Sequence, residues 1–151
     1  MDIITEKLMT LINTFPVLME GETIEFSVLD EDGGIAFFPT SGAAIERSEK
    51  DIVGHTVQVV TYPFMVFYRA SGLSENRKVD VKEWLDDLGR WLEGQPITVG
   101  GTTYVITYPT LDANRRFTRI QRSSPASLNG INDNNSEDWA ISIIARYTNE
   151  F

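Results

Sequence analysis

The chain has 151 residues, of which 42% are hydrophobic and 23% are charged, and its formal net charge is -9 at pH 7. This length and composition exclude a disordered chain and suit one domain, residues 1–151, with a core of its own. The acidic balance argues against sequence-independent nucleic-acid binding, because that binding depends on Lys and Arg meeting phosphates. The chain has no cysteine, which excludes disulfides and thiolate metal sites.

The first residues predict a helix. Apolar residues recur at helical spacing between Asp2 and Phe15, and Pro16 ends the run. Charged residues interrupt this segment, which is atypical of a cleaved secretory signal. No apolar run reaches the length that a membrane-spanning helix needs. We therefore expect a soluble chain without a membrane partner.

The following segment predicts a hairpin and a loop. Apolar and polar residues alternate over residues 23–29, which predicts a strand. The acidic turn at residues 30–34 and the apolar residues 35–38 predict a strand that returns beside the first one. Residues 39–54 show no convincing period and contain Gly, Ser and charged residues, so we expect a long loop there.

Two longer elements come next. Residues 55–69 form a β-rich run, but Pro63 cannot donate a ladder hydrogen bond, so we expect a bulge or a sheet edge at that residue. Residues 74–93 carry the strongest helical pattern of the chain, with a single apolar stripe. Ser74 is expected to cap the start of this helix, and Gly94 is expected to follow its end.

The last third predicts further strands. Residues 97–99 and 104–108 flank Gly100-Gly101 and predict a hairpin with a two-glycine turn. Residues 115–122 and 139–147 predict two more strands, whereas the polar residues 123–138 predict a loop. The order of elements predicts an α+β fold, a single domain with a mostly antiparallel sheet and two main helices packed on it.

No motif typical of an active site occurs in the sequence. His55 is the only histidine and has no accompanying nucleophile motif, so we interpret it as structural or exposed. The acidic residues 30–33 do not fit a calcium loop when their glycine is aligned with that of the motif. Asp86 is expected on the exposed face of the second helix, and Trp84 and Trp91 are expected in the core. We expect no enzymatic activity, no metal and no other cofactor.

Residues 115–122 read RRFTRIQR, which places four arginines within eight residues of an acidic chain. In a regular strand, Arg115 and Arg119 share one face, and Arg116 and Arg122 share the other. This division argues against a single row of phosphate contacts. Arginine is well suited to pairing with carboxylates across protein interfaces, so our first interpretation is pairing between subunits. Contact with DNA in the lumen of an assembly and a purely solubilising role are the alternatives.

Three long stretches of the chain resemble one protein family. They are IAFFPTSGAAIERSEKDIVGH (35–55), YPFMVFYRASGLSENRKVDVKEWLDDLGRWLEGQP (62–96) and EDWAISIIARYTNEF (137–151). In this order they are similar to the minor capsid proteins of tailed bacteriophages and of prophages of Gram-positive bacteria, which are also classed as tail terminator proteins. The resemblance covers most of the chain and carries over no catalytic residue.

The resemblance implies a virion structural protein at the head–tail junction, a homo-oligomeric and typically hexameric ring that caps the tail tube and helps to join the tail to the head. The implied partners are the tail tube protein and the head–tail connector protein, with passive contact to DNA in the lumen. The implied location is the virion, and the host cytoplasm during assembly.

A head-completion or connector protein of the same region is one alternative, and a small polyanion- or nucleic-acid-binding module that uses Arg115–Arg122 is another. A hydrolase built around His55 and acidic residues is the least favoured interpretation.

A ring requires two different contact faces on each subunit. The sheet edge expected at Pro63 and the strands that flank Gly100-Gly101 are candidates for these faces. The expected loops 39–54 and 123–138 are longer than those of most compact domains. We expect both loops to be mobile in the free subunit and to become ordered against neighbouring proteins.

Overall fold

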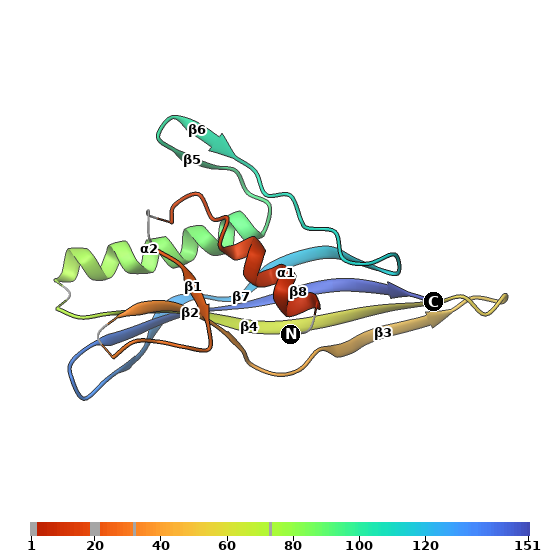
Figure 1. The fold of residues 1–151 in the computed structure, drawn as a ribbon, viewed down its shortest axis with the longest axis horizontal. Coiled ribbons are helices and arrows are strands. Elements are labelled where there is room, and N and C mark those ends of the chain that lie inside the picture. Colours follow the sequence, from red (N-terminus) through yellow and green to blue (C-terminus); the bar gives the residue numbers. More distant parts are fainter. Residues whose placement is uncertain (1–2, 19–21, 32, 73) are drawn as a thin grey trace.

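The computed structural model describes residues 3–18, 22–31, 33–72 and 74–151. Within these residues, two helices pack on a six-stranded, mostly antiparallel sheet, and a separate two-stranded hairpin projects from the body (Figure 1), which confirms the expected α+β fold. The main sheet has the strand order β1-β2-β4-β8-β7, and β3 pairs with the part of β4 that β2 does not reach. The elements are α1 (Ile3–Ile12), β1 (Ile24–Phe26), β2 (Gly34–Pro39), β3 (Ala44–Lys50), β4 (Thr56–Ala70), α2 (Glu75–Leu92), β5 (Ile97–Val99), β6 (Thr102–Tyr104), β7 (Arg115–Ile131) and β8 (Glu137–Glu150).

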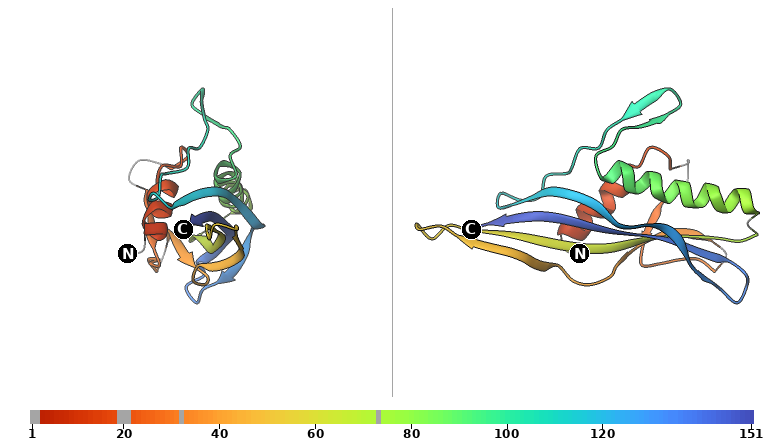
Figure 2. Two further views of the ribbon diagram at one scale, coloured as in Figure 1. Left: turned by 90° about the vertical axis from the view of Figure 1, so that its right-hand side faces the viewer. Right: turned by 180° about the vertical axis from the view of Figure 1, so that it is seen from behind.

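The ladder between β4 and β8 forms the centre of the sheet. It pairs residues 57–70 with residues 137–150 in one uninterrupted antiparallel register. Because side chains alternate along a strand, this register divides the sheet into two faces. Both helices lie on one of these faces (Figure 2). The buried side chains that β4 and β8 contribute to this helix-covered face are Val60, Tyr62, Phe64, Val66, Ile141, Ile143, Ala145 and Tyr147.

Both helices dock on the sheet through the apolar stripes that their sequences predict. Leu8 and Ile12 of α1 are fully buried, and the hydroxyl oxygens of Thr5 and Tyr62 lie 2.7 Å apart. Leu85, Leu88, Trp91 and Leu92 of α2 are buried in the same cluster, and the half-buried Trp84 packs against it. Asp2, where the first helix is expected to begin, lies outside the described residues.

The ends of α2 agree with the expected caps. The hydroxyl of Ser74 accepts a hydrogen bond from the amide of Arg77 at 3.4 Å. Beyond the last helical residue, Gly94 takes a φ of 95°, which lets the chain turn back on the helix end. The amides of Gly94 and Gln95 then donate to the carbonyls of Trp91 and Arg90. These bonds satisfy carbonyls that the end of a helix leaves without partners.

The expectation that Asp86 is exposed is wrong. Asp86 is only 5% exposed, and its carboxylate accepts hydrogen bonds from Nζ of Lys82 at 2.6 Å and from the amide of Ala126 at 2.9 Å. The amide of Ala126 is available because irregularities interrupt the pairing of β7 with β8 at this point. Burial acts to raise the pKa of Asp86, but these two bonds and the charges of Lys82 and Arg90 outweigh it and hold the pKa below its usual value. Asp86 therefore ties α2 to the far half of β7.

The predicted hairpin of β1 and β2 is also wrong, because the two strands are parallel. Asn13, just after α1, explains the arrangement. Its side-chain amide donates to the carbonyl of Ile24 at 3.1 Å, and its side-chain oxygen accepts from the amide of Ile24 at 2.8 Å. These bonds hold β1 at the end of α1, and the chain must then loop away before β2 begins. Of the acidic turn in this loop, Asp32 lies outside the described residues.

Two segments expected to be loops are mainly strands. Within residues 39–54, β3 pairs antiparallel with β4, and most of residues 123–138 continue β7 and begin β8. Both added strand segments are polar, so they show no apolar alternation. Their order comes from backbone hydrogen bonds to a neighbouring strand, which a side-chain pattern does not reveal. The expected mobility of these two segments therefore rested on a wrong assignment.

Pro63 lies neither at a bulge of the central ladder nor at a sheet edge. Its register with Ile144 of β8 is continuous with that of its neighbours. On the opposite side of β4, β2 ends opposite Phe64 and β3 begins opposite Thr61. The carbonyl of Pro63 accepts from the amide of Thr40 on that side. Because the N and C=O of one residue point to the same side of an antiparallel strand, the missing N–H of Pro63 faces the gap between β2 and β3.

Gly89 is the point of close approach between α2 and the sheet. A Cβ built on Gly89 would lie 2.8 Å from Cδ1 of the buried Ile141 and would overlap the side chain of Arg122. Arg122 has little freedom to move away, because its guanidinium is bonded to Glu93. The helix therefore requires a glycine on its sheet-facing side.

We expect Gly89→Ala to lower the free energy of unfolding by about 1–2 kcal/mol, because overpacking outweighs the better helix propensity of alanine. Urea denaturation followed by tryptophan fluorescence measures the change. Gly42→Ala is the matched control, since a Cβ there has no heavy atom within 4 Å. Equal stability of the two variants would contradict the close approach.

Candidate functional site

The four arginines of residues 115–122 do not act together. A β-bulge at Thr118 places Phe117 opposite Tyr147 and Arg119 opposite Arg146. The bulge reverses the alternation expected for a regular strand. Arg115 and Arg122 consequently lie on the helix-covered face, and Arg116 and Arg119 lie on the other face, which no described helix covers. The expected grouping of Arg115 with Arg119, and of Arg116 with Arg122, is wrong.

Arg115 and Arg122 bind carboxylates of their own chain. Nε of Arg115 donates to Asp112 at 2.8 Å, and this bond holds the pKa of Asp112 below its usual value. Nε and Nη2 of Arg122 lie 3.1 and 2.9 Å from Oε1 of Glu93, and the Arg122 amide donates to Oε2 at 3.1 Å. These two arginines hold the turn before β7 and the end of α2, so their charges are already matched inside the subunit.

Arg119 instead lines a hollow on the uncovered face. The hollow has a volume of about 690 Å³, and Arg47 and Arg146 also line it, together with Glu46 and residues of β4, β7 and β8. Nε of Arg146 lies 3.1 Å from Glu46, and Nε of Arg47 lies 3.5 Å from the exposed Glu49. Arg116 and Arg119 are exposed and form no ion pair within the described part of the chain. We call the hollow lined by Arg47, Arg119 and Arg146 the basic hollow.

Two bulges on opposite sides of the central ladder create the basic hollow. In β3 the extra residue is Glu46, which moves Arg47 opposite Val59. Val59 and its partner Thr148 both point to the uncovered face. The bulge at Thr118 likewise places Arg119 opposite Arg146, on the uncovered face. Bulges commonly redirect side chains in this way, and here both bring an arginine toward Arg146.

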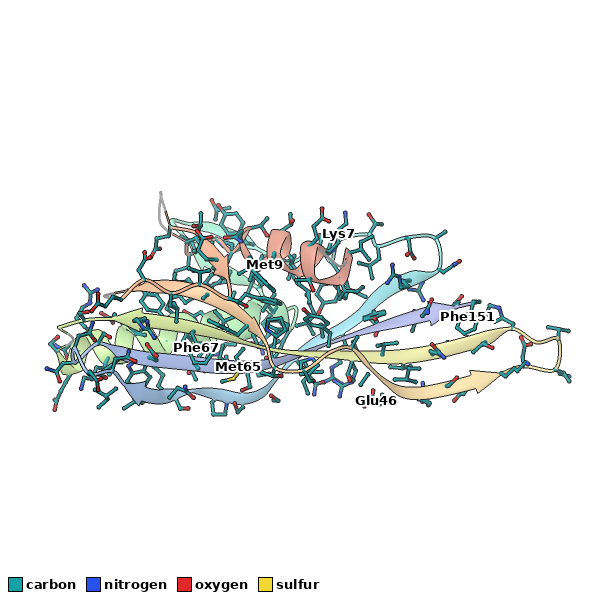
Figure 3. The ribbon with its side chains drawn as sticks, turned by 60° about the horizontal axis from the view of Figure 1, so that its bottom comes forward. Lys7, Met9, Glu46, Met65, Phe67 and Phe151 are labelled. Carbon is teal, nitrogen blue, oxygen red and sulfur yellow. The ribbon has the colours of Figure 1, made fainter. Side chains whose placement is uncertain are left out.

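The middle of the uncovered face is apolar. Phe38, Met65, Phe67 and Ile144 lie there half-buried, and the rings of Phe38 and Phe67 contact edge to face with centroids 5.2 Å apart. Figure 3 shows Met65 and Phe67 on this face, with Glu46 farther along toward the arm that β3 and β4 form. An apolar patch on a sheet face without covering elements is typical of a contact surface.

An ion pair closes the other end of this face. Nε and Nη2 of Arg69 donate to the two carboxylate oxygens of Asp138 at 2.6 and 2.9 Å. The bond from Arg69 is the main cause that lowers the pKa of Asp138, and a bond from Asn132 adds to it, against the opposing effect of burial. This bidentate pair joins β4 to β8 and leaves Asp138 ionised at neutral pH.

The hairpin of β3 and β4 projects beyond the helices as a long arm (Figure 1). At its tip, the carboxylate of Asp51 accepts hydrogen bonds from the amides of Val53 at 3.0 Å and His55 at 2.8 Å. This capped turn directs Ile52 and Val53 outward, with exposed fractions of 103% and 90%. We call Ile52 and Val53 the arm tip. Neither side chain contributes to the core of its own subunit.

A second projection is the hairpin of β5 and β6, which pair only with each other. Gly100 and Gly101 form its turn with φ values of 58° and 82°, as the sequence predicts. The predicted second strand over 104–108 is wrong, because β6 ends at Tyr104. The exposed Tyr104 and Val105 lie at its end. Figure 2 shows this hairpin standing away from the body on the helix side.

The residues considered for catalysis do not come together. His55 is exposed beside the arm tip, with Nε2 3.8 Å from Glu150. Trp91 is buried and Trp84 is half-buried, and both contact Phe15, which confirms their expected place in the core.

Residues 3–18, 22–31, 33–72 and 74–151 contain no group of three or more His, Asp or Glu side chains arranged to hold a metal ion. Neither helix formed by these residues has the length and apolar character needed to cross a bilayer.

Sequence reasoning missed Arg47, Arg146 and the arm tip. Arg47 and Ile52 fall in a segment expected to be a loop, and Arg146 lies in a strand noted only for its apolar face. The adjacent pair Ile52-Val53 in a polar segment was the available signal for the arm tip. No local signal places Arg47 beside Arg146, because their elements are joined only through the sheet.

Comparison of the chain with protein-family models gave no match. Comparison with curated proteins also gave no match.

We expect the free energy of unfolding to fall as the pH decreases below about 5. In the unfolded chain an Asp side chain has a pKa of about 3.9, and in the folded state the pKa values of Asp86 and Asp138 are lower than this. Their contribution to stability is present above the unfolded pKa and is lost as the pH falls through the folded pKa. Asp138→Asn should flatten this decrease in urea denaturation at a series of pH values.

The control for this experiment is Asp133→Asn, which removes an exposed carboxylate near the same turn. It should retain the pH profile of the unsubstituted protein. An unchanged profile in Asp138→Asn would show that the Arg69–Asp138 pair contributes nothing to stability.

Proposed function

We propose that this chain is a non-enzymatic virion structural protein at the head–tail junction of a tailed phage. In this proposal it forms a ring, typically hexameric, that caps the tail tube and helps to join the tail to the head. Its partners are then other copies of itself, the tail tube protein and the head–tail connector protein. Assembly takes place in the host cytoplasm, and the product resides in the virion. A head-completion or connector role in the same region uses the same surfaces and is the alternative.

The arm tip is the observation that carries this proposal. Two adjacent large apolar side chains, Ile52 and Val53, are held outward by a hydrogen-bonded turn at the end of a long hairpin. Fully exposed apolar side chains gain free energy only when another molecule covers them. An arm of this kind supports contact with a neighbouring subunit.

The distribution of surfaces also favours assembly over chemistry. A ring repeats one heterologous contact, so each subunit needs two surfaces that differ and fit each other. The arm tip projects at one end, and the half-buried apolar patch of Phe38, Met65 and Phe67 lies on the uncovered face. An active site would instead require a cluster of converging polar groups.

The nucleic-acid-binding alternative has weaker support. Of the four arginines that suggested it, Arg115 and Arg122 bind Asp112 and Glu93 of the same chain. The remaining charges form a small hollow and not an extended basic stripe. Binding to a polyanion requires many simultaneous phosphate contacts.

We expect Ile52→Ser combined with Val53→Ser to weaken self-association by more than tenfold while the fold is retained. Burying an Ile or Val side chain contributes about 2 kcal/mol, and about 1.4 kcal/mol corresponds to a factor of ten in affinity. Native mass spectrometry and sedimentation over a range of concentrations, with and without tail tubes, measure the association.

Val79→Ser is the matched control, because Val79 is an exposed apolar residue on α2. It should associate like the unsubstituted protein. If the unsubstituted chain stays monomeric at every concentration and also in the presence of tail tubes, the proposed function is wrong.

A further inference from the structure

We infer that the basic hollow binds carboxylates of a second copy of this chain, and that these carboxylates are Glu25 of β1 and Asp30 of the loop that follows it. This inference depends on the proposed function, because it names the charged part of the contact that would repeat around the ring. Within one subunit the basic hollow and these two carboxylates lie on different parts of the molecule, so they can meet only between two copies.

The hollow has an unmatched positive charge. Three arginines and one glutamate line it, and Arg146 already binds that glutamate, Glu46. Arg47 contacts Glu49 outside the lining at 3.5 Å, but both side chains are about two-thirds exposed, and such surface pairs are weak. Arg119 forms no ion pair with any described residue. A planar guanidinium suits bidentate binding of a carboxylate.

A second hollow has the opposite charge. It has a volume of about 440 Å³, lies along β1 and the loop that follows, and is lined by residues that include Glu22, Glu25, Asp30 and Val28, with no Lys or Arg among them. Glu25 and Asp30 form no ion pair with the described residues, and Glu25 only accepts a hydrogen bond from Thr23 at 2.8 Å. Asp86 and Asp87 of α2 differ, because Lys82 and Arg90 bind them within the helix.

The positions of the two hollows suit a head-to-tail contact. The acidic hollow lies at the β1 edge of the main sheet, whereas the basic hollow lies over β3, β8 and β7, at the base of the arm. A subunit that offers different, complementary surfaces in two places forms a heterologous contact, which closes into a ring or continues as a filament. The basic hollow adjoins the arm, so one neighbouring copy could cover both features. Opposite charges would then set the register of the contact.

A second copy is a better occupant than nucleic acid. The net charge of -9 repels a second copy as well as DNA. A second copy, however, brings Glu25 and Asp30 to a local contact, whereas a DNA duplex presents phosphates along its whole length to the acidic body of the protein. Glu46 in the lining of the hollow is also unfavourable for a phosphate.

Two charge-reversed variants test the inference. Arg119→Glu alone and Glu25→Arg alone should each weaken self-association about tenfold or more, and the loss should be smaller at high salt because the contact is screened. An equimolar mixture of the two variants should recover association. In an alternating assembly of the two variants, half of the contacts join two unaltered surfaces. The other half join the two reversed side chains, which again carry opposite charges.

Arg116→Glu is the control, because Arg116 is an exposed arginine of the same strand that does not line the basic hollow. It should change association by less than about threefold. Circular dichroism and the thermal midpoint establish that all variants are folded, as expected for exposed positions.

The outcomes separate this inference from the proposed function. If the unsubstituted protein associates and Arg119→Glu associates equally well, the charge contact is overturned and the ring proposal remains. The same holds if the mixture of the two variants fails to restore association. Retention of a short DNA duplex that is lost in Arg119→Glu, without a change in self-association, assigns the hollow to nucleic acid and overturns the inference. An unsubstituted chain that never associates overturns both.

Discussion

The continuous ladder between β4 and β8 is the constraint on which the rest of the structure depends. Its uninterrupted register fixes which side chains of these two strands face the helices and which face away. A slip of the register by one residue would exchange the two sets and would move the apolar side chains away from the helices. Packing of the helices therefore stabilises this register of the ladder. The bulges occur in the flanking strands β3 and β7, where a change of register leaves the central core unchanged.

This division gives the two faces of the sheet different roles. On the helix-covered face, Gly89 allows close approach, while Asp86 and Arg122 attach α2 to β7 through hydrogen bonds. The other face has an apolar centre, an internal ion pair at one end and an arginine-lined hollow at the other. Two hairpins also project beyond the body (Figure 1). The exposed apolar side chains and the arginine without an ion pair therefore lie on surfaces that other molecules can reach. This is the basis for proposing an assembly subunit.

The charge pattern follows the same logic. Copies of an acidic chain repel one another unless their local contacts are complementary. Here most arginines bind carboxylates of their own subunit, including Arg69, Arg115 and Arg122. Arg119 is an exception, and its position depends on the bulge at Thr118. Without this bulge, Arg119 would lie on the helix-covered face; with it, the guanidinium lies on the uncovered face, where a partner can reach it.

The sequence by itself determined α2 with its caps, the apolar side of β4 and β8, the two-glycine hairpin and the α+β class, because each has a local signal such as periodicity, a capping residue or a turn glycine. The tertiary structure alone decided the parallel pairing of β1, the strand identity of β3 and of the far half of β7, and the burial of Asp86. It also decided which arginines are matched, because a bulge shifts the face of every residue beyond it. These features depend on backbone partners distant in the chain, and hydrogen bonds between strands leave no pattern in polar side chains.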